Sequence, residues 1–111
     1  DLAATSPIMA QAAPKNYASK PRPAVVVQDE LFDGLDSVTV CPLTSTLVDA
    51  PLLRLPIAST EVSGIETDSH IMIDKITTVR RTNVGSRVGE INPQQLVELE
   101  RRLLVFLGIA R

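Results

Sequence analysis

The chain has 111 residues and a mass of 12.0 kDa, which is the size of a single domain and excludes an enzyme built from two. Its 11 Lys and Arg residues against 13 Asp and Glu residues give a formal net charge of −2, so the overall balance does not indicate a nucleic-acid partner. No apolar run approaches the roughly 18 residues that a membrane span needs, and one cysteine, Cys41, excludes an internal disulfide. We therefore expect a soluble protein, located in the cytoplasm.

The charges are distributed unevenly along the chain. Residues 1–23 contain three basic side chains and one acidic one, residues 24–74 one basic and nine acidic, and residues 75–111 seven basic and three acidic. Folding can bring the two basic ends together into one face. An ordinary solvated surface without a binding role is the alternative interpretation.

Several short apolar segments separated by turn residues predict a β protein. Residues 1–23 are rich in Ala, Ser and Pro and are typical of a tail, although residues 8–13 can form a weak first strand. Stronger strands are predicted at residues 24–28 and 37–44, followed by residues 52–57, 70–74 and 84–91. Only 3% of the residues are aromatic, so the core is expected to be aliphatic. The spacing suits a small barrel or sandwich.

A helix is predicted after the last strand. Asn92 is a suitable N-cap residue, and Pro93 and Gln95 fit the first and third helical positions. Apolar residues recur every three or four positions and Gly108 can end the helix; the stripe comprises Leu96, Leu99, Leu103, Phe106 and Leu107. This stripe can pack on the barrel, covering an open end, or bind a second subunit.

Most common catalytic arrangements are excluded by the residues available. One His, His70, and one Cys cannot supply the three or four ligands of a zinc site. Asp29, Asp33 and Asp36 lack the spacing of a calcium loop, so we expect turn formers there and no metal. His70 falls in a predicted strand with no nucleophile motif nearby, which favours a structural role. The five glycines are too scattered for a phosphate-binding loop.

Arginine and hydroxyl chemistry remains. Arg22 stands between Pro21 and Pro23 at the start of a predicted strand, where the backbone has little freedom, and a guanidinium is suited to phosphate oxygens. Thr44 and Ser45 follow at the end of the next strand and can hydrogen-bond the same phosphate. The alternative is a surface charge at a strand edge with hydroxyls that cap a turn.

Four segments, in order, resemble the MazF/PemK family of toxin endoribonucleases. Residues 20–28 (Lys-Pro-Arg-Pro-Ala-Val-Val-Val-Gln) are similar to the family's Arg-Pro step into a Val-rich strand, and residues 38–47 to its strand ending in a Thr-bearing turn. Residues 68–79, and residues 88–91 followed by the helix, are similar to the third and closing motifs. The likeness covers residues 20–111, and we expect residues 1–111 to form one such domain with a divergent N-terminal strand and loop at 1–19.

The resemblance implies a mainly β fold with a C-terminal helix, an SH3-like small β-barrel of the CcdB/MazF type. It also implies a homodimer that cleaves single-stranded RNA without a metal or other cofactor, by attack of the RNA 2′-hydroxyl on the adjacent phosphate. The family's catalytic Arg and Thr correspond to Arg22 and Thr44. The residues expected to bind RNA are Lys20, Ser45 and Tyr17, together with Arg80, Arg81 and Arg87 as a basic path for the backbone.

The expected partner of an RNase toxin is a cognate antitoxin whose disordered acidic tail folds over the RNA groove.

Two functions other than RNA cleavage also stay open. The related CcdB toxins share the barrel but bind DNA gyrase without cutting nucleic acid, so the fold alone does not determine the function. A degenerate, inactive toxin is the third alternative.

Overall fold

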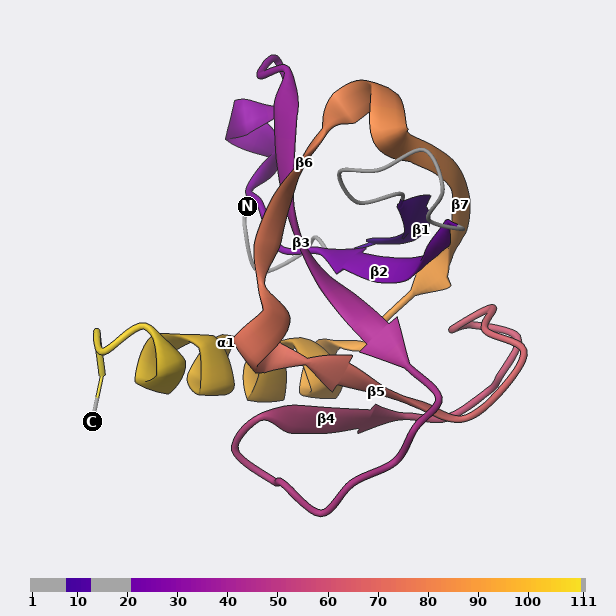
Figure 1. Ribbon diagram of the computed structural model, residues 1–111, viewed down its shortest axis with the longest axis vertical. Helices are drawn as coiled ribbons and strands as arrows, with labels where there is room; N and C mark the ends of the chain where they lie inside the picture. Colours follow the sequence, from indigo (N-terminus) through magenta and orange to yellow (C-terminus); the bar gives the residue numbers. More distant parts are fainter. Residues whose placement is uncertain (1–7, 13–20, 111) are drawn as a thin grey trace.

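The structure, a computed structural model, describes residues 8–12 and 21–110. Its strands form one antiparallel sheet in the order β4-β5-β3-β2-β1-β7, and β6 pairs with β3 beside this path (Figure 1). The strands are β1 (Ile8–Ala12), β2 (Arg22–Val26), β3 (Ser37–Thr44), β4 (Arg54–Ile57), β5 (Ser69–Met72), β6 (Thr77–Arg80) and β7 (Val84–Glu90). Helix α1 spans Pro93–Phe106, and short 3₁₀ helices occupy Glu30–Phe32 (η2), Ile73–Lys75 (η3) and Arg81–Asn83 (η4).

Strand β3 is the centre of the sheet because three strands pair with it. Its first half pairs with β6, from Ser37–Arg80 to Val40–Thr77, its middle pairs with β2, and its last two residues pair with β5. Alternating burial along β3 sends side chains into two separate apolar clusters. Cys41 and Leu43 belong to the larger cluster, under α1, and Val38 and Val40 to the smaller one.

The first strand has a more central position than the composition of the N-terminal segment indicated. Strand β1 lies between β2 and β7, with Met9 paired to both Val25 and Gly89. Met9 is fully buried in the main core, and Ala10 and Ala12 are buried as well. The interpretation of residues 1–23 as a tail is therefore wrong for Ile8–Ala12, where apolar and small side chains fill the interior.

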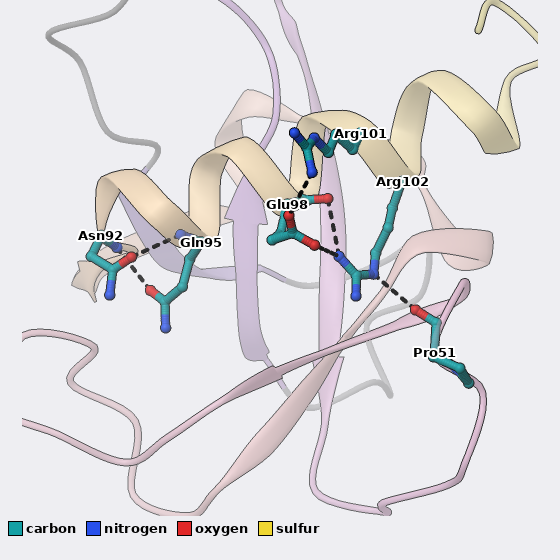
Figure 2. A network of polar contacts seen from close by, with 6 residues as sticks. All are labelled: Pro51, Asn92, Gln95, Glu98, Arg101 and Arg102. Atoms are coloured by element: carbon teal, nitrogen blue, oxygen red, sulfur yellow. Dashed lines mark hydrogen bonds and ion pairs between the residues drawn. The ribbon is translucent and has the colours of Figure 1, made fainter. Parts of the chain in front are cut away.

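Helix α1 begins where the sequence predicted. Asn92 Oδ1 accepts a hydrogen bond from Gln95 N, and Gln95 Oε1 accepts one from Asn92 N, each at 2.8 Å, which completes a capping box (Figure 2). Leu99 is buried in the main core, with Leu96 and Leu103 packed beside it.

The end of the helix does not follow the predicted stripe. Phe106 and Leu107 are 43% and 53% exposed, because the last turns of α1 project beyond the sheet (Figure 1). Arg102 joins this half of the helix to the loop between β3 and β4, and an ion pair within the helix orients its side chain. Arg102 Nη1 donates to Glu98 Oε1 at 2.7 Å, and its Nε donates to the Pro51 carbonyl at 2.8 Å (Figure 2).

The fold class is confirmed, with corrections to individual elements. The segment expected as a strand at 70–74 ends at Met72, because Ile73 turns into η3 and Asp74 forms an ion pair with Arg54 of β4. Strand β6 was not predicted, since only Val79 of its four residues is buried. Among the described residues no pairing joins β7 to β4 or β6, so the barrel is open. No helix in this part of the chain is both long and apolar enough to cross a membrane.

Candidate active site

A cavity of about 500 Å³ lies between the start of β2, the end of β3 and the loop that connects β4 to β5. This volume falls within the range of small-ligand sites. Figure 1 shows the β4–β5 loop below β2 and β7. The described residues that line the cavity are Gln11, Pro21, Arg22, Pro23, Leu43, Ser45, Gly64, Ile65, Glu66, Thr67, Ser69 and Val88. The predicted phosphate-binding Arg22 and Ser45 therefore line one site.

Arg22 is the first residue of β2 and its side chain is exposed. Ring closure fixes φ in Pro21 and Pro23 on either side, and β1 holds the strand through the Ala12–Arg22 pair. Arg22 thus lines a water-accessible cavity from a constrained backbone, and its guanidinium stays charged and can bind an anion through several N–H groups.

Thr44 and Ser45 mark the end of β3. The hydroxyl of Thr44 accepts a hydrogen bond from the backbone N–H of Thr46 at 3.1 Å, so a local turn fixes its orientation. Thr44 itself does not line the cavity, whereas its neighbour Ser45 does. The β2–β3 ladder has its last pair at Ala24–Pro42, so Arg22 and Thr44 each lie two residues beyond this pair at the same end of the ladder.

Thr44 lies beside a residue to which the sequence pattern assigned a structural role. His70 on β5 is its cross-strand partner, and directly opposed residues of an antiparallel pair have Cβ atoms about 4.5–5.5 Å apart. The Nδ1 atom of His70 is buried, with no hydrogen-bond partner among the described residues. The strand pattern placed His70 correctly in a strand, but only the register shows that it adjoins Thr44.

The β4–β5 loop provides cavity residues that sequence reasoning missed, including Glu66 and Thr67. The loop is fastened to itself, because Ser59 Oγ donates to the Ile65 carbonyl at 2.6 Å and Ser59 N donates to Asp68 Oδ1 at 2.8 Å. Glu66 sits between these two anchored points. A single acidic residue in a turn carries no sequence signal of such a role, so only the three-dimensional arrangement identifies it.

Two glycines let this loop pack against β7. Gly64 has φ of +71°, and a Cβ there would lie 1.9 Å from the Val88 carbonyl oxygen. A Cβ at Gly89 would lie 2.2 Å from the Ser63 carbonyl oxygen. Contacts this short are forbidden to any side chain, so the close approach of the loop and β7 depends on glycine at both positions.

The three arginines expected to form a path for RNA lie outside the cavity. Arg80 is exposed opposite Ser37, at the other end of β3 from Ser45. Beside it, Arg81 Nε donates to the Leu35 carbonyl at 2.7 Å, which ties η4 to the β2–β3 connection. Arg87 on β7 forms an exposed ion pair with Glu90 at 2.8 Å. Lys20 and Tyr17 lie outside the described residues.

No group of three or more His, Cys, Asp or Glu side chains in the described ranges is placed to hold a metal ion. The reactive groups around the cavity are instead one guanidinium, one carboxylate and the hydroxyls of Ser45, Thr67 and Ser69. Ser69 is buried and its hydroxyl donates to the Thr67 carbonyl at 2.8 Å. A cation, an anion and hydroxyls around one small cavity suit recognition and transfer of a phosphate ester.

Comparison with known families decides the relationship. Residues 8–107 match the model of the PemK-like, MazF-like toxins of type II toxin–antitoxin systems. The chain belongs to this family. A curated relative of this MazF-like toxin, from Mycolicibacterium smegmatis, is named probable endoribonuclease MazF. It is 50% identical over 94 residues, covering 85% of this chain and 86% of the relative.

Solved structures support the fold of this MazF-like toxin. The Mycobacterium tuberculosis toxin MazF-mt6 superimposes with a TM-score of 0.77 at 21% identity, over 96% of this chain and all of the other. MazF from Deinococcus radiodurans gives a TM-score of 0.71 at 18% identity, covering 93% of each chain. A mycobacterial endoribonuclease solved with its cognate antitoxin gives 0.74 at 16% identity, over 96% of this chain and 94% of the other.

Proposed function

We propose that this MazF-like toxin is an endoribonuclease that cleaves single-stranded RNA at short sequences without a metal ion, which inhibits translation and growth. The observation that supports it is the cavity shared by Arg22 and Ser45, because a phosphodiester seated there meets a fixed cation and a hydroxyl together. Half of the 94 aligned residues are identical to those of a protein named probable endoribonuclease MazF.

The reaction needs the protein to stabilise the charge that develops on the phosphate, and it needs no nucleophile from the protein because the RNA supplies its own. The RNA 2′-hydroxyl attacks the adjacent phosphorus, and the products are a 2′,3′-cyclic phosphate and a 5′-hydroxyl. Negative charge on the non-bridging oxygens rises in the transition state, and the Arg22 guanidinium would stabilise that charge. Thr44 lies next to the cavity residue Ser45, and its hydroxyl oxygen accepts a bond from Thr46 N. Its hydroxyl proton would then donate to a phosphate that reaches the end of β3.

RNA outside the cavity would follow the remaining basic side chains. Arg80, Arg81 and Arg87 are proposed for the backbone path, with Lys20 as a further cationic contact and Tyr17 as a stacking surface for a base. Of the three arginines, Arg81 and Arg87 also bond to other described residues.

The proposed partners are a cognate antitoxin and a second copy of the chain. A mycobacterial neighbour was solved with its antitoxin, and an acidic antitoxin segment would compete with RNA for Arg22. The uncovered apolar end of α1, with Phe106 and Leu107, is available to bury against another protomer. A toxin acting on mRNA works in the cytoplasm.

The test is cleavage of a mixed-sequence single-stranded RNA in EDTA, with mapping of the cut ends. We expect cuts at a repeated short sequence with 5′-hydroxyl ends. Arg22→Ala should lower the rate at least about 100-fold, the usual cost of losing one donor to a developing charge. A single 2′-deoxy nucleotide at the cut site should abolish cleavage there.

Arg101→Ala is the matched control. Arg101 is also an exposed arginine, 74% accessible, but it lies on α1 and pairs with Glu98, so its loss should leave cleavage unchanged. Full activity in a folded Arg22→Ala protein would contradict the assignment. Cleavage that disappears in EDTA would contradict the metal-free mechanism.

A further inference from the structure

The cavity contains a charged residue that the proposed mechanism has not used. Of the described residues that line it, Arg22 and Glu66 are the charged ones. Arg22 enters from the start of β2 and Glu66 from the β4–β5 loop, so they come from separate walls of one cavity. Cleavage by a 2′-hydroxyl needs a group that takes the hydroxyl proton, and neither a permanently charged guanidinium nor a neutral serine does this well at neutral pH.

The loop that carries Glu66 has the fixed geometry that such a role requires. Ile65, directly before it, is buried in the main core, and its carbonyl accepts from Ser59. Asp68, two residues after it, is the other acidic residue on this part of the loop, and its carboxylate accepts a hydrogen bond from the backbone N–H of Ser59.

The loop is also joined to β7, because Glu90 N donates to the Val62 carbonyl at 3.0 Å. Glu66 itself is exposed to the cavity solvent. Its carboxylate is thus carried on an anchored backbone and remains accessible to a substrate.

We propose that Glu66 is the general base of RNA cleavage, a step that rests on the proposed endoribonuclease function. The Glu66 carboxylate removes the proton of the 2′-hydroxyl as the 2′-oxygen bonds to phosphorus. The bond from phosphorus to the 5′-oxygen then breaks, and that oxygen takes a proton from a water molecule. The hydroxide left behind takes the proton from Glu66, which regenerates the carboxylate. Arg22, which lines the same cavity, balances the charge on the phosphate throughout.

The experiment is a pH–rate profile of single-turnover cleavage from pH 4 to pH 9, with wild-type protein and Glu66→Gln. Glutamine keeps the size of the side chain and removes its basicity. We expect the variant to be slower by at least about 100-fold, which is the lower range for general base catalysis. The wild-type rate should rise with pH as the carboxylate ionises, and this rise should be absent from the variant.

Three further measurements separate a base from a merely structural residue. Glu66→Asp should keep the rise with pH at a reduced rate. Binding of an RNA with one 2′-deoxy nucleotide at the cut site should stay within about threefold of wild type in Glu66→Gln. Glu61→Gln, in the same loop but outside the cavity, should be unchanged in rate and in binding.

The outcomes test the role of Glu66 separately from the endoribonuclease function on which it rests. If the wild-type chain cleaves RNA and Glu66→Gln cleaves within about threefold of it, the role of Glu66 is refuted while the endoribonuclease function stands. A slow variant that keeps the wild-type rise with pH also refutes the general base. If the wild-type chain leaves every RNA intact, both proposals fail together.

Discussion

Replacing Gly89 with Ala tests whether the cavity depends on the close approach of the β4–β5 loop to β7. The added Cβ would lie 2.2 Å from the Ser63 carbonyl oxygen and 2.5 Å from the Val62 carbonyl oxygen. Both obstacles are backbone atoms, which cannot rotate away as the end of a side chain can. The loop must therefore move outward by about 1 Å to reach ordinary contact distance.

The magnitude follows from the contacts that this movement breaks. Forcing an extra methyl group into a packed site costs about 1–3 kcal/mol. The bond from Glu90 N to the Val62 carbonyl is lengthened or lost, which adds about 1 kcal/mol. We expect a loss of about 2–4 kcal/mol in the free energy of unfolding. With a urea dependence of about 2 kcal/mol/M for a domain of this size, the midpoint falls by about 1–2 M.

The assay is urea unfolding at one fixed protein concentration, with three other glycines as controls. A methyl group added at Gly34 would have nothing within 4 Å, and φ there is not positive, so Gly34→Ala should be neutral or stabilise by up to about 1 kcal/mol. Gly108 has open space but φ of +75°, and Ala there should cost about 1–2 kcal/mol. Gly64 combines both problems, so Gly64→Ala should be the least stable of the four.

The reasoning is refuted if Gly89→Ala unfolds at the same urea concentration as Gly34→Ala. The order of the four variants also matters, because a Gly108→Ala loss larger than that of Gly89→Ala would mean that backbone conformation outweighs the steric contact. Since the loop holds Glu66, Gly89→Ala should slow RNA cleavage under conditions where the protein is still folded.

Three other predictions concern groups away from the cavity. Asp74→Asn should cost about 1–3 kcal/mol of stability in chemical denaturation, because the largely buried Arg54 side chain loses its partner; a double-mutant cycle with no coupling between the two would contradict this. Asn92→Ala should cost about 1 kcal/mol, measured by thermal unfolding, because the bond from Gln95 N is lost. Asn92→Gly loses the same bond but should cost only a few tenths, since Gly is itself favoured at the N-cap. Burial raises the pKa of the Cys41 thiol from 9.0 to about 12, so a thiol reagent should react only as fast as the native protein opens. Ionisation of the thiol favours the unfolded chain, so the free energy of unfolding should fall as the pH rises above 9. Rapid reaction of Cys41 with the thiol reagent at pH 8 would contradict its burial.

The elements with strong local signals were predictable from the sequence. The alternation in residues 37–44 predicted both ends of β3 correctly. Asn92, Pro93 and Gln95 predicted the start of α1, because helix capping depends on residues that are neighbours in the chain. The end of α1 could not be placed in the same way. Periodicity shows which face of a helix is apolar, but the sheet decides how far along the helix that face is covered, and Phe106 lies beyond it.

The candidate site was predictable only in part, for a related reason. Arg22 stood out because two prolines constrain it, and Ser45 because it follows a strand end. Glu66 and Val88 reach the same cavity through the packing of a loop on β7, a long-range contact that two glycines permit without any recognisable motif. Local patterns identify residues that are constrained by their neighbours in sequence, and the residues missed are constrained by neighbours in space.

The placement of β1 between β2 and β7 has a consequence for how the protein is made. Ile8 pairs with Glu90, so the hydrogen bonds between β1 and β7 can form only after nearly the whole chain has been synthesised. Sheets whose contacts join distant parts of the chain fold slowly, and β7 also contributes Val88 to the cavity wall. On a ribosome the cavity is thus among the last features to form, and a chain released before β7 lacks both the second partner of β1 and part of the site.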